Sequence, residues 1–454
     1  MSGPPCGILA PLAPPSLAVS WLAPLAGALW AAWHLRHAYF FYDEWGMVGR
    51  VLHAGMWEGM FASFNGHLWA LQYWIYRIQV HQFGVDDHRF VGVVFVAALV
   101  VLHLGLATLL RVSGLSAISS TLLAGLLTYL GASSQNFVFA VQASPALSLA
   151  AGTAATAIVL AGRPTRRRAA GVAGLLVLSV AIDSGTALAT IAMSGVATML
   201  AWRGPARLAV LPALVIVVLW FGFVPAPVFH AGWDTRAHFA VRLLLHATGA
   251  LAAGGSRTGL VLWLLAAILV AMAFRGGHLD ARSRIMIAAG GAATCVVLAA
   301  IAYARAGIEG DFVTHNRYLQ NVAIPLTLAL APACAIAGRG VVRAAWPSPP
   351  AGAATGLAAL VFAGAFLLGL TPKDIYLREF VSYNVGVRDG VTSAARVIRD
   401  GCPSGQPPVA ASQPLGSISP QLTTGLVREL LDRGFLSPPA AGPIDPAVAA
   451  RMCS

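Results

Sequence analysis

The sequence predicts an all-α polytopic membrane protein, and three observations support this class. Of 454 residues, 58% are hydrophobic and only 10% are charged, whereas soluble domains carry about 25% charged residues. Apolar stretches of about 20 residues, enough to cross a bilayer core, recur along the chain. The charged residues lie in short clusters between these stretches. The composition therefore excludes a soluble globular enzyme, a disordered chain and a disulfide-rich secreted scaffold.

About eleven transmembrane helices are expected, because only a helix satisfies a lone segment's backbone polar groups in lipid. The fifth and sixth are short and are separated only by Asp183-Ser184-Gly185. They are predicted to form either a hairpin that does not fully cross or one broken element. The expected spans are 17–35, 90–110, 115–132, 146–162, 171–183, 186–202, 208–224, 258–274, 285–304, 318–338 and 353–370.

The arginines predict the orientation, since basic residues near span ends are retained in the cytoplasm. They fall on alternate loops, with a dense run at 163–168. The opposite loops, which include a long first loop at 36–89, are then extracytoplasmic, as is everything after residue 370. We expect a multi-pass plasma-membrane protein with a transmembrane domain at 1–370 and an extracytoplasmic region at 371–454. The net charge of +12 is attributed to arginines that mark the cytoplasmic loops, and not to a surface that binds nucleic acid.

The C-terminal region, from Thr371 onward, has ordinary polarity, with Pro, Gly and Ser among charged residues. Its apolar pattern is weak outside Leu422 to Leu431, which predicts a small, loop-rich α or α/β cap. Cys402 and Cys453 are its only cysteines, and an oxidising compartment favours their pairing. The alternative is two unpaired thiols in a mobile tail.

The first external loop opens with an aromatic run that leads into Asp43 and Glu44. Adjacent carboxylates at the boundary between bilayer and water suit a general base or a metal ligand that faces a lipid-borne substrate. The plainer interpretation is an interfacial aromatic belt followed by solvated acids.

Farther along this loop, apolar residues from Leu68 to Ile78 recur at helical spacing among aromatic residues, which predicts a helix lying in the interface plane. His67 precedes it and can bind a phosphate, pair with a carboxylate or serve as a polar cap. The cluster His81, Asp86, Asp87 and His88 has metal-ligand chemistry, but its two aspartates are read as caps of the second span.

Three more polar residues or clusters lie at expected span ends. Arg317 and Tyr318 lead into a span that contains Pro325, and a phosphate is a natural bidentate partner for an arginine there; the alternative is snorkelling to head groups. Arg257 lies on another external segment. Asp183 could relay protons in a transporter, but an N-cap of the sixth span is favoured.

This arrangement resembles the C-type membrane glycosyltransferases, which include protein mannosyltransferases, the lipid A aminoarabinose transferase and actinobacterial arabinosyltransferases. The resemblance rests on the Asp43-Glu44 pair in a long first external loop, the helix entered through Asn65-Gly66-His67, and Arg317-Tyr318-Leu319 with Pro325 entering a late span. It covers most of residues 17–370 as architecture, and its motifs are short. The tail matches no family known to us.

The resemblance implies transfer of a sugar from a polyprenyl-phosphate carrier to a hydroxyl of a glycan, lipid or protein acceptor, usually with inversion. Asp43 would be the general base, with Glu44 as second candidate. Arg317, helped by His67, Tyr318 or Arg257, would neutralise the departing phosphate. Some members of the family need a divalent cation; here no cofactor is predicted and a cation is left open. A secondary transporter or lipid flippase, or a non-catalytic membrane scaffold, are the alternatives.

Overall fold

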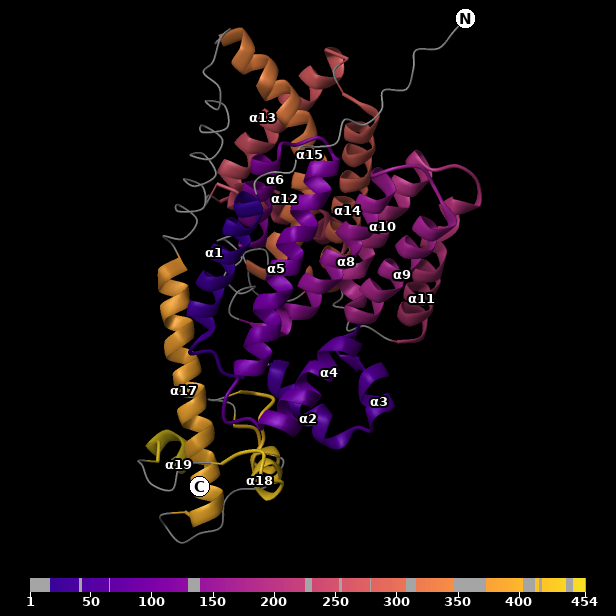
Figure 1. Cartoon of the computed structure of the whole chain (residues 1–454). Coiled ribbons are helices and arrows are strands. Elements are labelled where there is room, and N and C mark those ends of the chain that lie inside the picture. Colours follow the sequence, from indigo (N-terminus) through magenta and orange to yellow (C-terminus); the bar gives the residue numbers. More distant parts are fainter. Residues whose placement is uncertain are drawn as a thin grey trace, which may run out of the picture.

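The computed structural model is a tall helical bundle with a smaller assembly at one end (Figure 1). It describes residues 17–40, 43–64, 66–129, 139–224, 231–252, 255–277, 279–307, 316–345, 373–402, 413–415, 419–437 and 444–453. At four helix ends, 17–20, 316–317, 338–345 and 373–381, only the backbone is described.

The bundle consists of helices that follow the apolar stretches of the sequence, together with α12, which carries several charged residues and lies between two of these stretches. They are α1 (Leu17–Leu35), α5 (Arg89–Val112), α6 (Ala117–Thr128), α8 (Ala143–Leu160), α9 (Arg166–Ile182), α10 (Ser184–Ala201), α11 (Leu211–Phe223), α12 (Trp233–Ala250), α13 (Ser256–Arg275), α14 (Ala281–Arg305) and α15 (Asn316–Ala345). Short 3₁₀ turns precede α8 and α11, at Ala140–Gln142 and Gly204–Val210.

Within the described part of the chain, seven helical segments are long and apolar enough to cross a membrane. This confirms a multi-pass, all-α membrane protein, but the expected count of eleven is not confirmed. The helix α6 has 12 residues and α9 has 17, and the predicted span 353–370 lies outside the described residues. The seven are Arg89–Val112, Ala140–Leu160, Ser184–Ala201, Gly204–Phe223, Ser256–Arg275, Ala281–Arg305 and Tyr318–Ala337.

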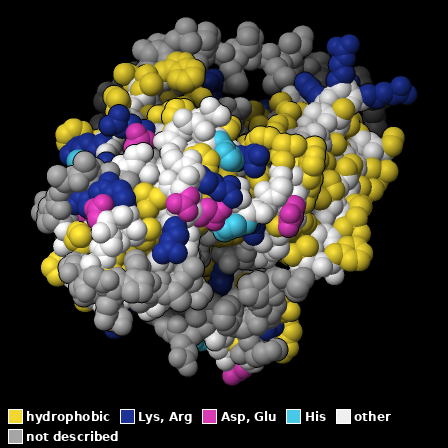
Figure 2. Space-filling model, turned by 90° about the horizontal axis from the view of Figure 1, so that it is seen from below, with side chains coloured by type: hydrophobic (Ala, Val, Ile, Leu, Met, Phe, Trp, Pro, Cys, Tyr) yellow, Lys and Arg dark blue, Asp and Glu magenta, His cyan; other side chains and the backbone are white. Residues whose placement is uncertain are grey.

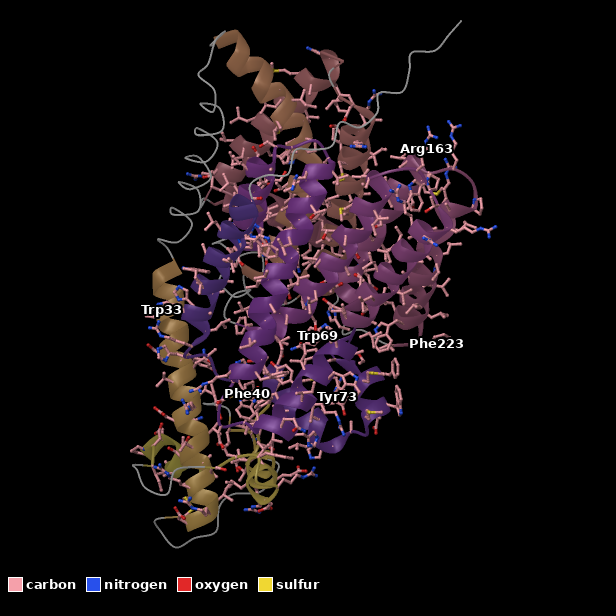
Figure 3. The ribbon with its side chains drawn as sticks, in the orientation of Figure 1. Trp33, Phe40, Trp69, Tyr73, Arg163 and Phe223 are labelled. Atoms are coloured by element: carbon pink, nitrogen blue, oxygen red, sulfur yellow. A yellow bond between two sulfur atoms is a disulfide. The ribbon has the colours of Figure 1, made fainter. Side chains whose placement is uncertain are left out.

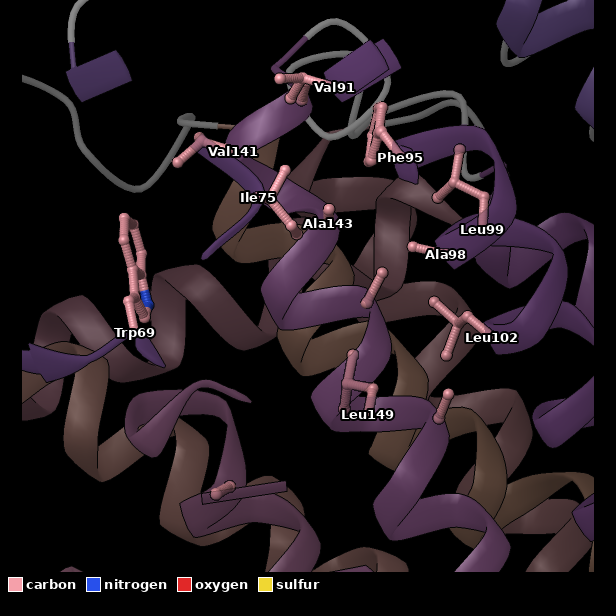
Figure 4. Packing of buried hydrophobic residues seen from close by; sticks show 14 of the residues in the cluster. Trp69, Ile75, Val91, Phe95, Ala98, Leu99, Leu102, Val141, Ala143 and Leu149 are labelled. Carbon is pink, nitrogen blue, oxygen red and sulfur yellow. The ribbon is translucent and has the colours of Figure 1, made fainter. Parts of the chain in front are cut away.

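The core of the bundle forms where α5 packs on α8 (Figure 4). The side chains of Phe95, Leu99 and Leu102 are buried there, and Leu149 on α8 is buried in the same cluster. Gly105 permits the close approach, because a Cβ at this position would lie 2.8 Å from the hydroxyl of Thr153. Small residues at a helix contact let two backbones approach, which is how membrane helices gain packing energy.

The short fifth and sixth segments are two helices, α9 and α10, which pack against each other and against α8. The chain breaks between them at Asp183, whose side chain accepts a hydrogen bond from the backbone N–H of Gly185. Asp183 is therefore the N-cap of α10, as expected. The two segments form a hairpin of separate helices.

The first external loop forms a compact unit at one end of the bundle. Its elements are α2 (Asp43–His53), α3 (Met56–Phe61), an antiparallel two-stranded hairpin of β1 (Ser63–Phe64) and β2 (His67–Leu68), α4 (Ala70–Ile78) and a π turn at Gln79–Phe83. Gly66 in the hairpin turn has φ of 85°, a conformation that glycine adopts at no steric cost.

The expected interfacial helix is present as α4, but its burial differs from the predicted apolar stripe. Ile75 is buried and Ile78 is exposed, whereas Tyr73 and Tyr76 are fully buried. Their rings lie against α2 and α3, with which α4 is in contact. Protein covers much of this helix, and its position in the interface plane stays a prediction.

The C-terminal region is more helical than the loop-rich cap that was expected. It contains α17 (Lys373–Asp400), α18 (Thr424–Asp432) and α19 (Pro446–Met452), with an isolated bridge between Pro414 and Thr423. A disulfide joins Cys402 to Cys453, whose Cα atoms are 5.6 Å apart, so the two cysteines are paired as the sequence suggested. The sequence pattern missed the 28-residue α17, because its polar side chains left no span-like signal.

The first external loop and the C-terminal region lie together at one end of the molecule, and Arg163 lies at the other (Figure 3). Val85 N–H donates to Phe435 O over 2.7 Å, and Ser437 N–H donates to an Asp86 carboxylate oxygen over 2.8 Å. Tyr39 N–H donates to the Asn384 side chain over 3.2 Å. The C-terminal region is thus bound directly to the loop that carries Asp43.

Candidate functional site

Asp43 begins α2, where unpaired backbone N–H groups and the helix dipole favour a negative charge. Its Oδ1 accepts a hydrogen bond of 3.1 Å from Gln421 Nε2 of the C-terminal region. The carboxylate is half-buried. Asp43 therefore lies where the first external loop meets the tail, and not on a freely solvated surface.

Glu44 is only 1% exposed and belongs to a separate, buried polar cluster. Its Oε1 accepts a hydrogen bond from Tyr76 Oη and lies 2.9 Å from Nε2 of His88. Burial raises the pKa of Tyr76 well above its ordinary value of 10.0, and the negative charge of Glu44 raises it further. The phenol thus stays protonated and keeps donating to the carboxylate. Buried charges need such partners, and Glu44 obtains them inside the loop.

A cleft of about 400 Å³ lies between α2 and α18. Three of its lining residues are glycines, and an ion pair of 2.7 Å between His53 Nε2 and Glu429 Oε2 crosses it. Glu429 also pairs with Arg433 at 2.5 Å. The lining residues are Trp45, Gly46, Gly49, His53, Gln421, Thr423, Gly425, Leu426 and Glu429. Acidic, basic and histidine side chains gather on the face seen in Figure 2, with hydrophobic side chains along one flank.

His67 pairs with Asp183 and not with the Asp43-Glu44 pair. Nδ1 of His67 lies 3.1 Å from Asp183 Oδ1, which also accepts from Trp69 Nε1 over 3.0 Å. Because an ionised carboxylate can only accept, Nδ1 carries the proton in this pair, and Nε2 is the nitrogen directed elsewhere. Pairing with a carboxylate, one of the three roles expected for His67, is therefore the role observed.

The hairpin that carries His67 is held by three elements. Leu68 N–H donates to Ser184 Oγ over 2.9 Å, and Trp220 Nε1 donates to Gly66 O over 3.0 Å. From α2, the Arg50 guanidinium donates to two backbone carbonyls, Ala62 O and Ser63 O. The hairpin thus bridges α2, which carries Asp43, and the junction of α9 and α10.

The residues expected to bind phosphate lie on two further helices. Arg257 is exposed at the second residue of α13, and Tyr318 is buried in the first turn of α15. Arg317 belongs to that same turn, but its side chain lies outside the described ones. Its pairing with a phosphate stays a prediction.

The four residues of the suggested metal cluster point to different partners. His88 bonds to Glu44, Asp86 to Ser437 N, Asp87 to Arg89 N at the start of α5, and the His81 ring packs on Phe435. Among the described residues there is no group of three or more His, Cys, Asp or Glu side chains that could hold a metal ion. Only Asp87 has the capping contact that was expected of both aspartates.

The sequence reasoning did not identify Gln421, His53 and Glu429 as site residues. Gln421 is 378 positions from Asp43, and His53 is 376 positions from Glu429. No local pattern could join such distant residues. The only available signal was that Leu422 to Leu431 is the apolar stretch of the tail, and all but the last residue of α18 lies in this stretch.

The chain matches no protein-family model, no curated protein and no solved structure.

Proposed function

We propose that the protein is a membrane glycosyltransferase that moves a sugar from a polyprenyl-phosphate donor to an acceptor hydroxyl on the extracytoplasmic face. The observation that carries the proposal is the environment of Asp43: a half-buried carboxylate at a helix N-terminus, bonded to Gln421, which lines a cleft beside it. A general base needs an ionised carboxylate within reach of a substrate hydroxyl. Asp43 supplies the carboxylate, and its bond to Gln421 places it next to a cleft that could hold a substrate.

Asp43 is a better candidate base than Glu44. Glu44 is enclosed and already accepts a hydrogen bond from Tyr76, with His88 beside it. Its role in the proposal is structural, since it ties α2 to α4 and to the start of α5. Asp43 Oδ1 has a neutral amide partner, which orients the carboxylate without neutralising its charge.

In the proposed step, Asp43 takes the proton from the acceptor hydroxyl while the oxygen of that hydroxyl attacks the anomeric carbon of the donor sugar. The bond between that carbon and the phosphate oxygen breaks, and the polyprenyl phosphate leaves with the electron pair. Attack opposite to the leaving group inverts the anomeric centre. Arg317 is assigned to the phosphate, where charge develops in the transition state. Tyr318, Arg257 and the doubly protonated form of His67, whose Nε2 then also carries a proton, are assigned as further donors.

The direct test is transfer by the purified full chain in liposomes. The donors are radiolabelled polyprenyl-phosphate pentoses and hexoses, and the acceptors are envelope glycans and lipids. We expect Asp43→Asn to lower kcat by about 10²- to 10⁴-fold, the range that a positioned general base contributes. Glu58→Gln is the matched control, since Glu58 is an exposed acid of the same loop on α3, and it is expected to transfer at the wild-type rate.

Two outcomes would contradict the proposal. If the wild-type protein transfers no sugar from any of these donors, the activity is wrong. If Asp43→Asn transfers as fast as Glu58→Gln, the assignment of the base is wrong. Lipid flipping without transfer in the same liposomes would favour a flippase.

A further inference from the structure

We infer that the cleft between α2 and α18 is the binding site for the acceptor, a neutral polyhydroxylated ligand such as a sugar, and that Gln421 is a positioning residue for Asp43. The inference rests on the proposed function and deepens it. The groups that line the cleft indicate which ligand it binds and what the C-terminal region contributes to the site.

The orientation of the Gln421 amide follows from its partner. An ionised carboxylate accepts only, so the Nε2 side of the amide faces Asp43 and Oε1 faces away. Oε1 is buried and has no hydrogen-bond partner among the described residues, and the same holds for Nε1 of Trp45. Both residues line the cleft. When these two side chains turn toward the cleft, a hydroxyl group, which donates and accepts, would satisfy both the unpaired acceptor and the unpaired donor.

The charges of the cleft favour a neutral ligand over the donor phosphate. Glu429 contributes a carboxylate to the lining, and the nearby side chains of His53 and Arg433 already pair with it. Asp43 adds a second negative charge beside Gln421. An anionic phosphate would be repelled by these carboxylates, whereas a sugar hydroxyl can bond to either of them.

Glycines create the space. A Cβ at Gly49 would meet only Leu426 Cδ2, at 3.8 Å, so a larger side chain at this position extends into the cleft. A Cβ at Gly46 would lie 2.2 Å from Gln421 Oε1. Because that oxygen ends a flexible side chain, Gly46→Ala should push the amide off Asp43 while the helix persists, alanine being the stronger helix former. A substitution at Gly49 therefore tests the space for the ligand, whereas a substitution at Gly46 tests the position of Gln421.

The first experiment measures binding without donor and without turnover. Saturation-transfer-difference NMR on the protein in nanodiscs would use methyl pentosides and methyl hexosides as ligands. We expect at least one glycoside to bind the wild-type protein and Gly49→Leu to weaken its binding at least tenfold. Gly92→Ala on α5, where an added Cβ meets nothing within 4 Å, is the control and should bind as the wild type does. If no glycoside binds the wild type, or if Gly49→Leu binds equally well, the cleft is not the acceptor site.

The second experiment separates positioning from binding by kinetics. Gly49→Leu should raise the acceptor KM at least tenfold and leave the donor KM unchanged. Gln421→Leu and Gly46→Ala should instead lower kcat with a smaller change in the acceptor KM, because they release the Asp43 carboxylate without filling the cleft. Gln421→Asn should restore part of the kcat that Gln421→Leu loses. An unchanged kcat in both Gln421→Leu and Gly46→Ala would overturn the role of Gln421.

The failures of the two proposals are distinguishable. Glycoside binding that Gly49→Leu abolishes, in a protein that transfers no sugar, would refute the transferase and retain the cleft as a carbohydrate site. Transfer with an unchanged acceptor KM in Gly49→Leu would retain the transferase and refute the cleft.

Discussion

The helical bundle differs in its hydrogen-bond partners from the external assembly, the unit formed by the first external loop and the C-terminal region. In the bundle, hydroxyls on α8, α9 and α10 bond to one another: Ser148 to Ser179 at 2.8 Å, and Ser179 to Thr190 at 3.0 Å. In the external assembly carboxylates bond to partners far away in the sequence, as in the pairs of Glu429 with His53 and of Asp43 with Gln421.

This difference separates groups that hold helices together from groups available for chemistry. A neutral hydroxyl pair satisfies a helix contact in lipid without the cost of burying a charge. Carboxylates such as Asp43 and Glu429 lie in the external assembly, where α2 meets the tail. The hydroxyl contacts in the bundle are therefore read as structural, and substitutions in the two regions should have separable effects.

The largest expected effect is on the tail. Replacing both Cys402 and Cys453 by Ser removes a link across a sequence separation of 51 residues, which should cost the external assembly about 4 kcal/mol of unfolding free energy. Limited proteolysis should then cut the tail much faster, while the bundle keeps its helical circular dichroism. The pair Cys295→Ser and Cys334→Ser, which removes the two free cysteines of the described residues, is the control. Equal proteolysis of both double variants would contradict the prediction.

The second effect is confined to the bundle. Gly152→Ala places a Cβ 2.1 Å from Thr190 Cβ, so α8 and α10 must separate, at a cost of about 1–3 kcal/mol typical of overpacking. Thermal unfolding in detergent measures it. Gly174→Ala on α9, where a Cβ meets nothing within 4 Å, should unfold at or above the wild-type temperature. A Gly152→Ala variant as stable as Gly174→Ala would show that the contact is loose.

The smallest expected effect concerns the buried cluster around Glu44. Tyr76→Phe removes a hydrogen bond to the carboxylate and should cost about 1–2 kcal/mol at neutral pH. The raised pKa of Tyr76 means that its contribution is complete below pH 10 and declines as the pH rises further, because the unfolded chain ionises first. The variant should therefore lose less stability than the wild type between pH 9 and pH 11.

Chemical unfolding across this pH range tests the sign of the effect. Tyr303→Phe, at a half-exposed tyrosine of α14, is the matched control and should retain the wild-type alkaline decline. A decline in Tyr76→Phe as steep as that of the control would contradict the role given to the phenol.

Local sequence patterns anticipated much of the fold. Stretches of about 20 apolar residues predicted helices such as α5, α13 and α14, because span length and hydropathy are local properties. Asp183 was recognised as an N-cap from its position between two short helices. The pairing of Cys402 with Cys453 followed from composition and compartment. The helix α17 was missed, because a polar helix has no comparable hydropathy signal.

The candidate site was only partly predictable. Asp43 and His67 were selected from aromatic and polar context, but their partners, Gln421 and Asp183, were not assigned to them. Glu44 was the second candidate for the general base after Asp43, since position alone does not exclude a carboxylate that adjoins it. The structure separates them, because successive residues of a helix point about 100° apart.

The sequence by itself determined the class of the protein, the apolar helices and the two polar regions, 36–89 and 371–454, that carry candidate residues. Those properties depend on hydropathy and charge over short windows of chain. Only the tertiary structure decided that the tail covers α2, that Gln421 holds Asp43 and that Glu44 is enclosed by Tyr76 and His88. Contacts between residues hundreds of positions apart depend on the packing of the whole chain, and packing leaves no local pattern to read.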